Sequence, residues 1–107
     1  MYEAVSIRWR GEWHVVHMSD SSFTVVRATD RAVVPLEELD DAFWKELDKV
    51  VKNKGLYLAW KFAIRMGIPQ GDEKKKWRAL RRRVRGYLEY IEQLASNNVG
   101  NHGHTDH

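Results

Sequence analysis

The chain has 107 residues, 43% of them hydrophobic, so it can build about one domain around a single modest core. It contains no Cys, which excludes disulfides, thiolate nucleophiles and every zinc site that needs sulfur. With a net charge of +3, no run near the ~18 apolar residues of a membrane span and no signal-peptide pattern, we expect a cytoplasmic protein without a membrane partner.

Residues 3–34 have the pattern of an antiparallel sheet. Runs rich in β-branched and aromatic residues alternate with short turn sequences such as Arg10-Gly11. Connections this short allow only antiparallel neighbours, so we expect a four-stranded antiparallel β-meander. In the first strand Val5, Ile7 and Trp9 share the face that should meet the core. The expected strands are residues 3–9, 12–18, 23–28 and 32–34.

Three helices are expected after the strands. In residues 36–51 the apolar positions recur every three or four residues, and acidic residues gather near the start, where the helix dipole favours them. Gly55 is expected to end this helix. Residues 56–66 are apolar almost all round, which predicts a buried central helix. Asp72 can cap a third helix, long and basic, that runs to about Ser96.

The sequence therefore predicts an α+β fold in one domain, residues 1–96. Residues 97–107 have little to bury, and we expect them to form a disordered polar tail. The tail carries His102, His104 and His107, but a glycine-rich segment does not preorganise metal ligands, so we expect no metal site there. A Gly-rich phosphate loop does not occur, and we expect no cofactor.

The basic charge belongs to the second half of the chain. Residues 1–53 hold seven Lys and Arg against ten Asp and Glu, whereas residues 54–107 hold eleven against five. On a helical wheel, six cations of the third helix fall within roughly 120° of each other and span ~16 Å, enough to follow several phosphates of a nucleic acid. This basic ridge consists of Lys74, Lys75, Arg78, Arg81, Arg82 and Arg85.

The basic ridge lacks acidic neighbours, because residues 74–85 contain no Asp or Glu. Like charges at helical spacing repel by roughly 0.2–0.5 kcal/mol per pair, so a partner should offset the repulsion. One interpretation is that the ridge docks on acidic side chains of the first helix, among them Asp40, Asp41, Glu46 and Asp48. The other partners are a nucleic acid, which we favour, an acidic protein and an anionic membrane surface.

Aromatic and basic residues also alternate at the tip of the first hairpin, in Arg8, Trp9, Arg10 and Trp13. Single-strand binders combine cations with aromatic platforms, and each stacked base contributes ~1–3 kcal/mol. A turn of two residues would place the two Trp side chains on opposite faces of the sheet, and a turn of three would place them on one face. Either Trp could instead belong to the core.

The segment before the basic ridge weakly resembles a helix-turn-helix, because Ala63 and Gly67 precede a basic helix. Its turn contains Pro69 and is about five residues long, against the ~3–4 usual for that motif. A regulator of duplex DNA is therefore one alternative, and a protein-interaction module that uses the ridge is another. No nucleophile with a nearby base is evident, so we do not expect an enzyme.

The order of parts is similar to that of the archaeal single-stranded-DNA-binding proteins called ThermoDBP and their relatives. The likeness covers residues 3–96: strands ending in Val33-Val34-Pro35-Leu36, then Trp-rich helices and the basic ridge. It implies a cleft between sheet and helix with an apolar floor and basic rims, little sequence preference, and a homodimer through the C-terminal helix. The sequence has no long separate leucine zipper. Its 31% charged residues and lack of Cys also suit a thermophile.

The leading hypothesis is a non-enzymatic protein that binds single-stranded DNA or RNA. The basic ridge, with Lys61 and Arg65, would contact phosphates, and Trp9 or Trp13 would stack on bases. Four other aromatic residues lie on apolar helical stripes and are expected in the core, namely Trp44, Trp60, Phe62 and Trp77.

Overall fold

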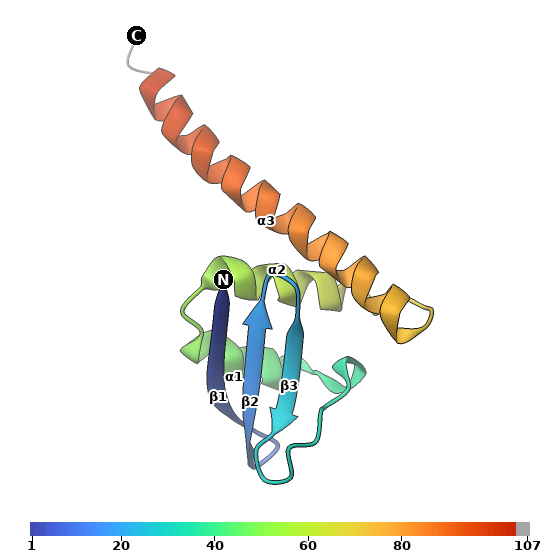
Figure 1. Ribbon diagram of the computed structural model, residues 1–107. Coiled ribbons are helices and arrows are strands. Elements are labelled where there is room, and N and C mark those ends of the chain that lie inside the picture. Colours follow the sequence, from blue (N-terminus) through green and yellow to red (C-terminus); the bar gives the residue numbers. More distant parts are fainter. Residues whose placement is uncertain (105–107) are drawn as a thin grey trace.

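A sheet covered on one face by two helices forms the body of the molecule, and a long third helix crosses this body and projects beyond it (Figure 1). The computed structural model describes the backbone of residues 1–104 and the side chains of residues 1–97. The molecule measures 60 × 31 × 22 Å, and its long dimension follows the projecting helix. The expected α+β class, with antiparallel strands followed by three helices, is confirmed.

The sheet is a meander of β1 (Tyr2–Trp9), β2 (Glu12–Ser19) and β3 (Phe23–Arg27), paired antiparallel in chain order. Side chains alternate between the two faces, as the pleat requires. The inner face is the buried one, as expected from the pattern of the first strand. It presents Ile7 and Trp9 from β1, His14, Val16 and Met18 from β2, and Phe23 and Val25 from β3.

The β1–β2 turn contains two residues, and this decides the register that the sequence left open. Arg10 and Gly11 both have positive φ, 56° and 77°, the conformation in which a two-residue turn follows the twist of its strands. Trp9 consequently pairs with Glu12, which places Trp9 and Trp13 on opposite faces. Trp9 is 3% exposed and Trp13 is 51% exposed.

The fourth strand expected at residues 32–34 is not formed. The segment makes one isolated bridge, between Val33 and Val26. Before the bridge the chain turns sharply, and the Asp30 carboxylate accepts hydrogen bonds from the Ala32 amide at 3.1 Å and from the Arg27 side chain. After it comes Pro35, which has no amide hydrogen to extend a ladder. Pairing is therefore confined to the few residues between the turn and the proline.

The single helix expected after Pro35 is a 3₁₀ turn, Leu36–Glu38, followed by α1 (Asp41–Val50). The break occurs because Asp40 is extended and caps α1, accepting from the Phe43 amide at 2.9 Å. The Trp9 indole donates to the same carboxylate oxygen at 3.0 Å. The Phe43 amide, and then Trp9, hold the pKa of Asp40 below its usual value.

Helix α2 (Lys54–Arg65) begins at an Asn53 cap, so Gly55 lies inside this helix and does not end the preceding one. Its inner side is fully buried and includes Trp60, whose indole donates to the Ser19 carbonyl at 2.7 Å. The composition of this helix suggested that it would be buried on all sides, but it is not. Three apolar side chains on its outer side are 41–61% exposed, namely Leu58, Phe62 and Met66.

The core joins the inner face of the sheet to α1 and α2 through aromatic rings. Phe23 lies near the centre, with its ring centroid 5.6 Å from that of Trp44, 5.7 Å from Trp60 and 6.3 Å from Phe43. Trp9 packs edge-on against Phe43 at 5.2 Å. Trp44 and Trp60, which the sequence assigned to the core, are therefore core residues.

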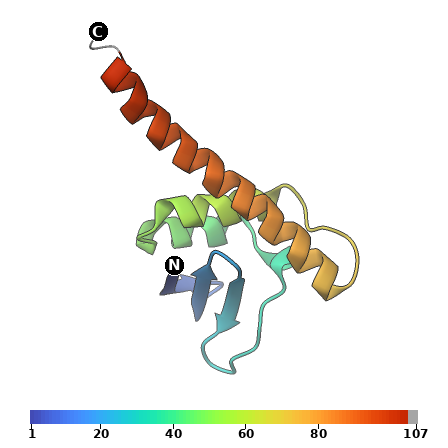
Figure 2. The same ribbon diagram turned by 45° about the horizontal axis from the view of Figure 1, so that its top comes forward.

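Helix α3 (Glu73–His104) packs on the body through fully buried Leu80 and Val84 and then leaves it (Figures 1 and 2). It continues past Ser96, so its expected end was placed too early. The backbone is helical up to His104, where we expected a disordered tail. Residues 105–107 of that tail lie outside the described residues.

One further arginine fixes α3 to α2. The Arg83 guanidinium donates from Nη1 to the carbonyls of Ala63, at 2.9 Å, and Gly67, at 2.6 Å. The Ala63 carbonyl belongs to the last turn of α2, which has no intrahelical donor for it, and Gly67 lies just beyond the helix end. Among residues 1–104, no helix is long and apolar enough to cross a membrane.

Candidate nucleic-acid interface

The basic ridge lies on a flank of α3 that faces away from α2. Five of its six residues are exposed, and Arg81 is half-buried. Among the described side chains, no ridge residue forms an ion pair or a side-chain hydrogen bond. The carboxylates of α1 have other neighbours: Asp41 pairs with Arg65, Glu46 with Lys49, and Asp48 with Lys54. The interpretation that the ridge docks on the acidic first helix is therefore wrong.

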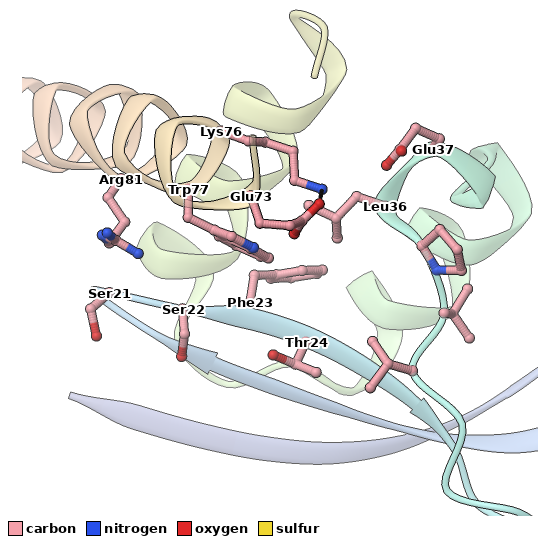
Figure 3. A pocket seen from close by; sticks show the side chains of 13 residues that line it. Ser21, Ser22, Phe23, Thr24, Leu36, Glu37, Glu73, Lys76, Trp77 and Arg81 are labelled. Atoms are coloured by element: carbon pink, nitrogen blue, oxygen red, sulfur yellow. Dashed lines mark ion pairs between the residues drawn. The ribbon is translucent and has the colours of Figure 1, made fainter. Parts of the chain in front are cut away.

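A cleft of about 640 Å³ borders the ridge, between β3, the segment around the 3₁₀ turn, and the first turns of α3 (Figure 3). We call it the β3–α3 cleft. Its floor is apolar and includes Phe23, Leu36 and Trp77. Arg81 lines it as well, so the ridge forms one wall. The volume lies within the range of ~300–1,000 Å³ that is usual for sites of small ligands.

The two ends of the cleft carry different charged side chains. Lys76 reaches Glu73 with a nitrogen–oxygen distance of 2.8 Å, in a pair above the ring of Phe23 (Figure 3). The Lys76 ammonium, and more weakly the Trp77 indole, hold the pKa of the Glu73 carboxyl below its usual value. Arg81 lies at the other end, near the hydroxyl groups of the β2–β3 turn (Figure 3).

The ridge continues from the cleft along the β2–β3 turn. A second hollow, of about 300 Å³, is lined by Asp20 and Ser21 from that turn and by Arg81, Arg85 and Leu88 from α3. Arg81 lines both hollows, so the cationic wall is continuous from one to the other. A chain of phosphates could follow this wall while one of its bases entered the β3–α3 cleft.

The hairpin tip lies at the opposite end of the sheet from α3 (Figure 1). The ends of β2 are separated by seven residue steps, or roughly 23 Å at the rise of an extended strand. Trp9 is a core residue, and Arg10 lies over its ring at 4.1 Å while pairing with Glu38 at 2.9 Å. Trp13 is the exposed tryptophan of the tip, with Arg8 5.4 Å from its ring centroid.

Lys61 and Arg65 lie on the outer side of α2 and not beside the basic ridge. Arg65 pairs with Asp41 at 3.4 Å, and Lys61 lies 5.6 Å from the ring centroid of Tyr57. Both line a hollow of about 380 Å³ with the exposed apolar side chains of α2 and with Tyr87 of α3. The site residues expected from the sequence thus fall into three separate groups, of which the ridge is the largest.

Sequence reasoning missed the cleft itself. It assigned Trp77 to the core, whereas Trp77 is half-buried, with its ring packed 6.2 Å from Trp60 while also lining the cleft. The spacing of Glu73, Trp77 and Arg81, four residues apart, was the available signal, because such residues share one side of a helix. Among the described residues, no group of three or more His, Cys, Asp or Glu side chains could hold a metal ion.

Compared with protein-family models, with curated proteins and with solved structures, the chain matches none of them. The similarity to ThermoDBP therefore rests on the order of parts in the sequence, and the function has to be argued from the site.

Proposed function

We propose that the protein is a non-enzymatic binder of single-stranded nucleic acid. The basic ridge contacts the phosphate backbone, and the β3–α3 cleft receives a base. The observation that carries this proposal is a row of six unpaired cations that borders an aromatic-floored cleft.

The unpaired state of the ridge supports a polyanionic partner. In the described part of the chain, five of the ten cations of the body pair with carboxylates, among them Arg10, Arg27 and Arg65, whereas none of the six ridge cations does. The cations of the ridge repel one another and gain nothing from carboxylates of the fold. A phosphate backbone offsets this repulsion and releases counterions as it binds.

The position of Trp77 favours a single strand over a duplex. The indole lies on the floor of a cleft, between β3 and α3, and not on a convex surface. A base paired and stacked inside a duplex cannot reach such a floor without being extruded, which costs a few kcal/mol. A base of a single strand can enter at a much smaller cost and contributes its π-face whatever its identity.

The proposal includes a homodimer through α3. The helix extends beyond the body, and its apolar residues Tyr90 and Leu94 are 55% and 44% exposed. They follow Tyr87, which stacks on the exposed Phe62 with ring centroids 5.1 Å apart. Light scattering after size-exclusion chromatography should give twice the chain mass, and Leu94→Glu should give the single-chain mass. A wild-type monomer at micromolar concentration would contradict the dimer.

Binding is tested by fluorescence anisotropy with labelled single-stranded DNA, the matching duplex and single-stranded RNA, each at two salt concentrations. We expect a single strand to bind more tightly than the duplex, with affinity that falls steeply as salt rises. A preference for duplex that depends strongly on sequence would instead support the helix-turn-helix regulator. No binding to any of the three at low salt would support the protein-interaction module.

A further inference from the structure

The β3–α3 cleft carries opposite charges at its two ends, with aromatic rings between them. Glu73 and Glu37 lie at the end near the 3₁₀ turn, together with Lys76, which pairs with Glu73, so this end carries one net negative charge. Arg81 lies at the end near the β2–β3 turn (Figure 3). The half-buried Trp77 ring lies in the middle, with the fully buried ring of Phe23 beneath it. A ligand that fills this cleft therefore meets a cation at one end and, at the other, two carboxylate acceptors of which one is shared with Lys76.

The difference in charge between the two ends of the cleft follows from a spacing of four residues along α3. Glu73, Trp77 and Arg81 follow one another along one side of the helix, each step advancing about 6 Å. A nucleotide has the matching order of groups, with an anionic phosphate, a flat ring and a hydrogen-bonding base edge. With its phosphate at Arg81 and its ring on Trp77, such a nucleotide would direct its base edge toward the carboxylates.

Both carboxylates can accept a hydrogen bond from a ligand. Glu73 is 78% exposed and shares its charge with Lys76 alone among the ion pairs of the described side chains. Its depressed pKa means that it is ionised at neutral pH and therefore has no proton to donate. Glu37 is exposed and points from the 3₁₀ turn toward Lys76 (Figure 3). Among the described side chains, Glu37 forms no ion pair.

Bases differ in what they present to such acceptors. Cytosine and adenine carry an exocyclic amino group, a donor, where thymine and uracil carry a carbonyl oxygen, an acceptor. A carboxylate therefore attracts the first pair and repels the second. Arg81 contributes equally to all four, because every nucleotide has the same phosphate.

We propose that Glu37 and Glu73 make the β3–α3 cleft selective for cytosine and adenine, which carry an amino group where thymine and uracil carry a carbonyl oxygen, over thymine and uracil. This inference rests on the proposed function and assigns to it one selective position within otherwise sequence-tolerant binding. It also explains why acidic side chains lie in a site for a polyanion, although they weaken the attraction between the protein and the phosphate backbone of the nucleic acid.

The test compares oligo(dC) with oligo(dT) of equal length, which differ in this group while both remain pyrimidines. Anisotropy titrations at slightly alkaline pH, where oligo(dC) stays unfolded, should give about tenfold tighter binding of oligo(dC), the size expected for one good base contact. The double variant Glu37→Gln/Glu73→Gln should bring the ratio close to one, because a glutamine amide offers a donor as well as an acceptor.

The matched control is Glu89→Gln/Glu92→Gln, which removes the same two negative charges from exposed positions further along α3. It should tighten binding of both oligonucleotides and keep their ratio. Equal tight binding of both by the wild type, or a preference for oligo(dT), overturns the inference and leaves the proposed function standing. An unchanged ratio in the Glu37→Gln/Glu73→Gln variant overturns the role of these carboxylates, and no binding of either oligonucleotide overturns both proposals.

Discussion

The cations of the body and those of the basic ridge on α3 differ in how they are paired. In the body, five of the ten cations pair with carboxylates of the same fold; for example, Arg10 pairs with Glu38, Arg27 with Asp30 and Arg65 with Asp41. On α3 the basic ridge is left without such partners. Charges of the first kind help to fix turns and helix ends, whereas the ridge contributes nothing evident to the fold. The difference separates residues that fold the chain from residues that are free to bind.

The two tryptophans of the first hairpin give the largest contrast between folding and surface residues. Trp9→Ala should lower the free energy of unfolding by about 3–5 kcal/mol, because it leaves a cavity beside Phe43 and removes the indole bond to Asp40. Trp13→Ala should change it by less than about 0.5 kcal/mol, because that side chain is half exposed. Urea denaturation measures both. Similar losses in the two variants would mean that the hairpin has another register.

Two arginines of α3 separate the same roles within one helix. Arg83→Ala should cost about 2 kcal/mol of stability, because two carbonyls at the end of α2 lose their charged donor. Arg82→Ala, the neighbouring ridge residue, should cost less than about 0.5 kcal/mol. Thermal melts of the two single variants make the comparison. Equal stability of the two would show that the Arg83 contacts do not matter to the fold.

Removing ridge charges should alter binding and not folding. Arg78→Ala combined with Arg82→Ala should weaken binding to all sequences alike and reduce the slope of log affinity against log salt by about 1.4, since ~0.7 counterions are released per single-strand phosphate contact. Its unfolding curve should match that of the wild type. A loss of stability like that of Trp9→Ala would mean that the ridge is part of the fold after all.

The smallest expected effect is the contribution of Asp40 to the stability of the fold at acid pH. The folded state lowers the pKa of Asp40, so its stabilising effect is full above the unfolded value of about 3.9 and is lost as pH falls through the lower folded value. Asp40→Asn keeps a cap on α1 but cannot titrate. The advantage of the wild type in melting temperature should therefore shrink between about pH 5 and pH 2. A constant difference over this range would remove Asp40 from the acid response.

The elements and their order could be predicted from local patterns, because periodicity and turn chemistry are properties of short segments. The alternation of Val5, Ile7 and Trp9 correctly gave the inner face of β1. What failed depended on contacts between distant segments. The cap that Asp40 makes on α1 breaks the expected first helix, and the Asp30 turn with Pro35 reduces the fourth strand to a bridge.

The site was predictable only in part, for the same reason. The basic ridge follows from helical geometry alone, and its six positions do share one flank of α3. The β3–α3 cleft joins residues more than fifty positions apart, such as Phe23 and Trp77, so no local pattern could reveal it. The sequence also could not separate the ridge from Lys61 and Arg65, since that depends on how α2 and α3 pack.

The short connections of the meander suggest an order in which the elements of the molecule fold. β1, β2 and β3 are neighbours both along the chain and in the sheet, so their pairing closes only short loops, which is typical of rapid folding. Helix α3 is the last element of the chain, and it packs on the body through Leu80 and Val84. Its docking is expected to be the final event. The β3–α3 cleft has one wall from each side of that junction, so the cleft itself forms only when α3 has docked.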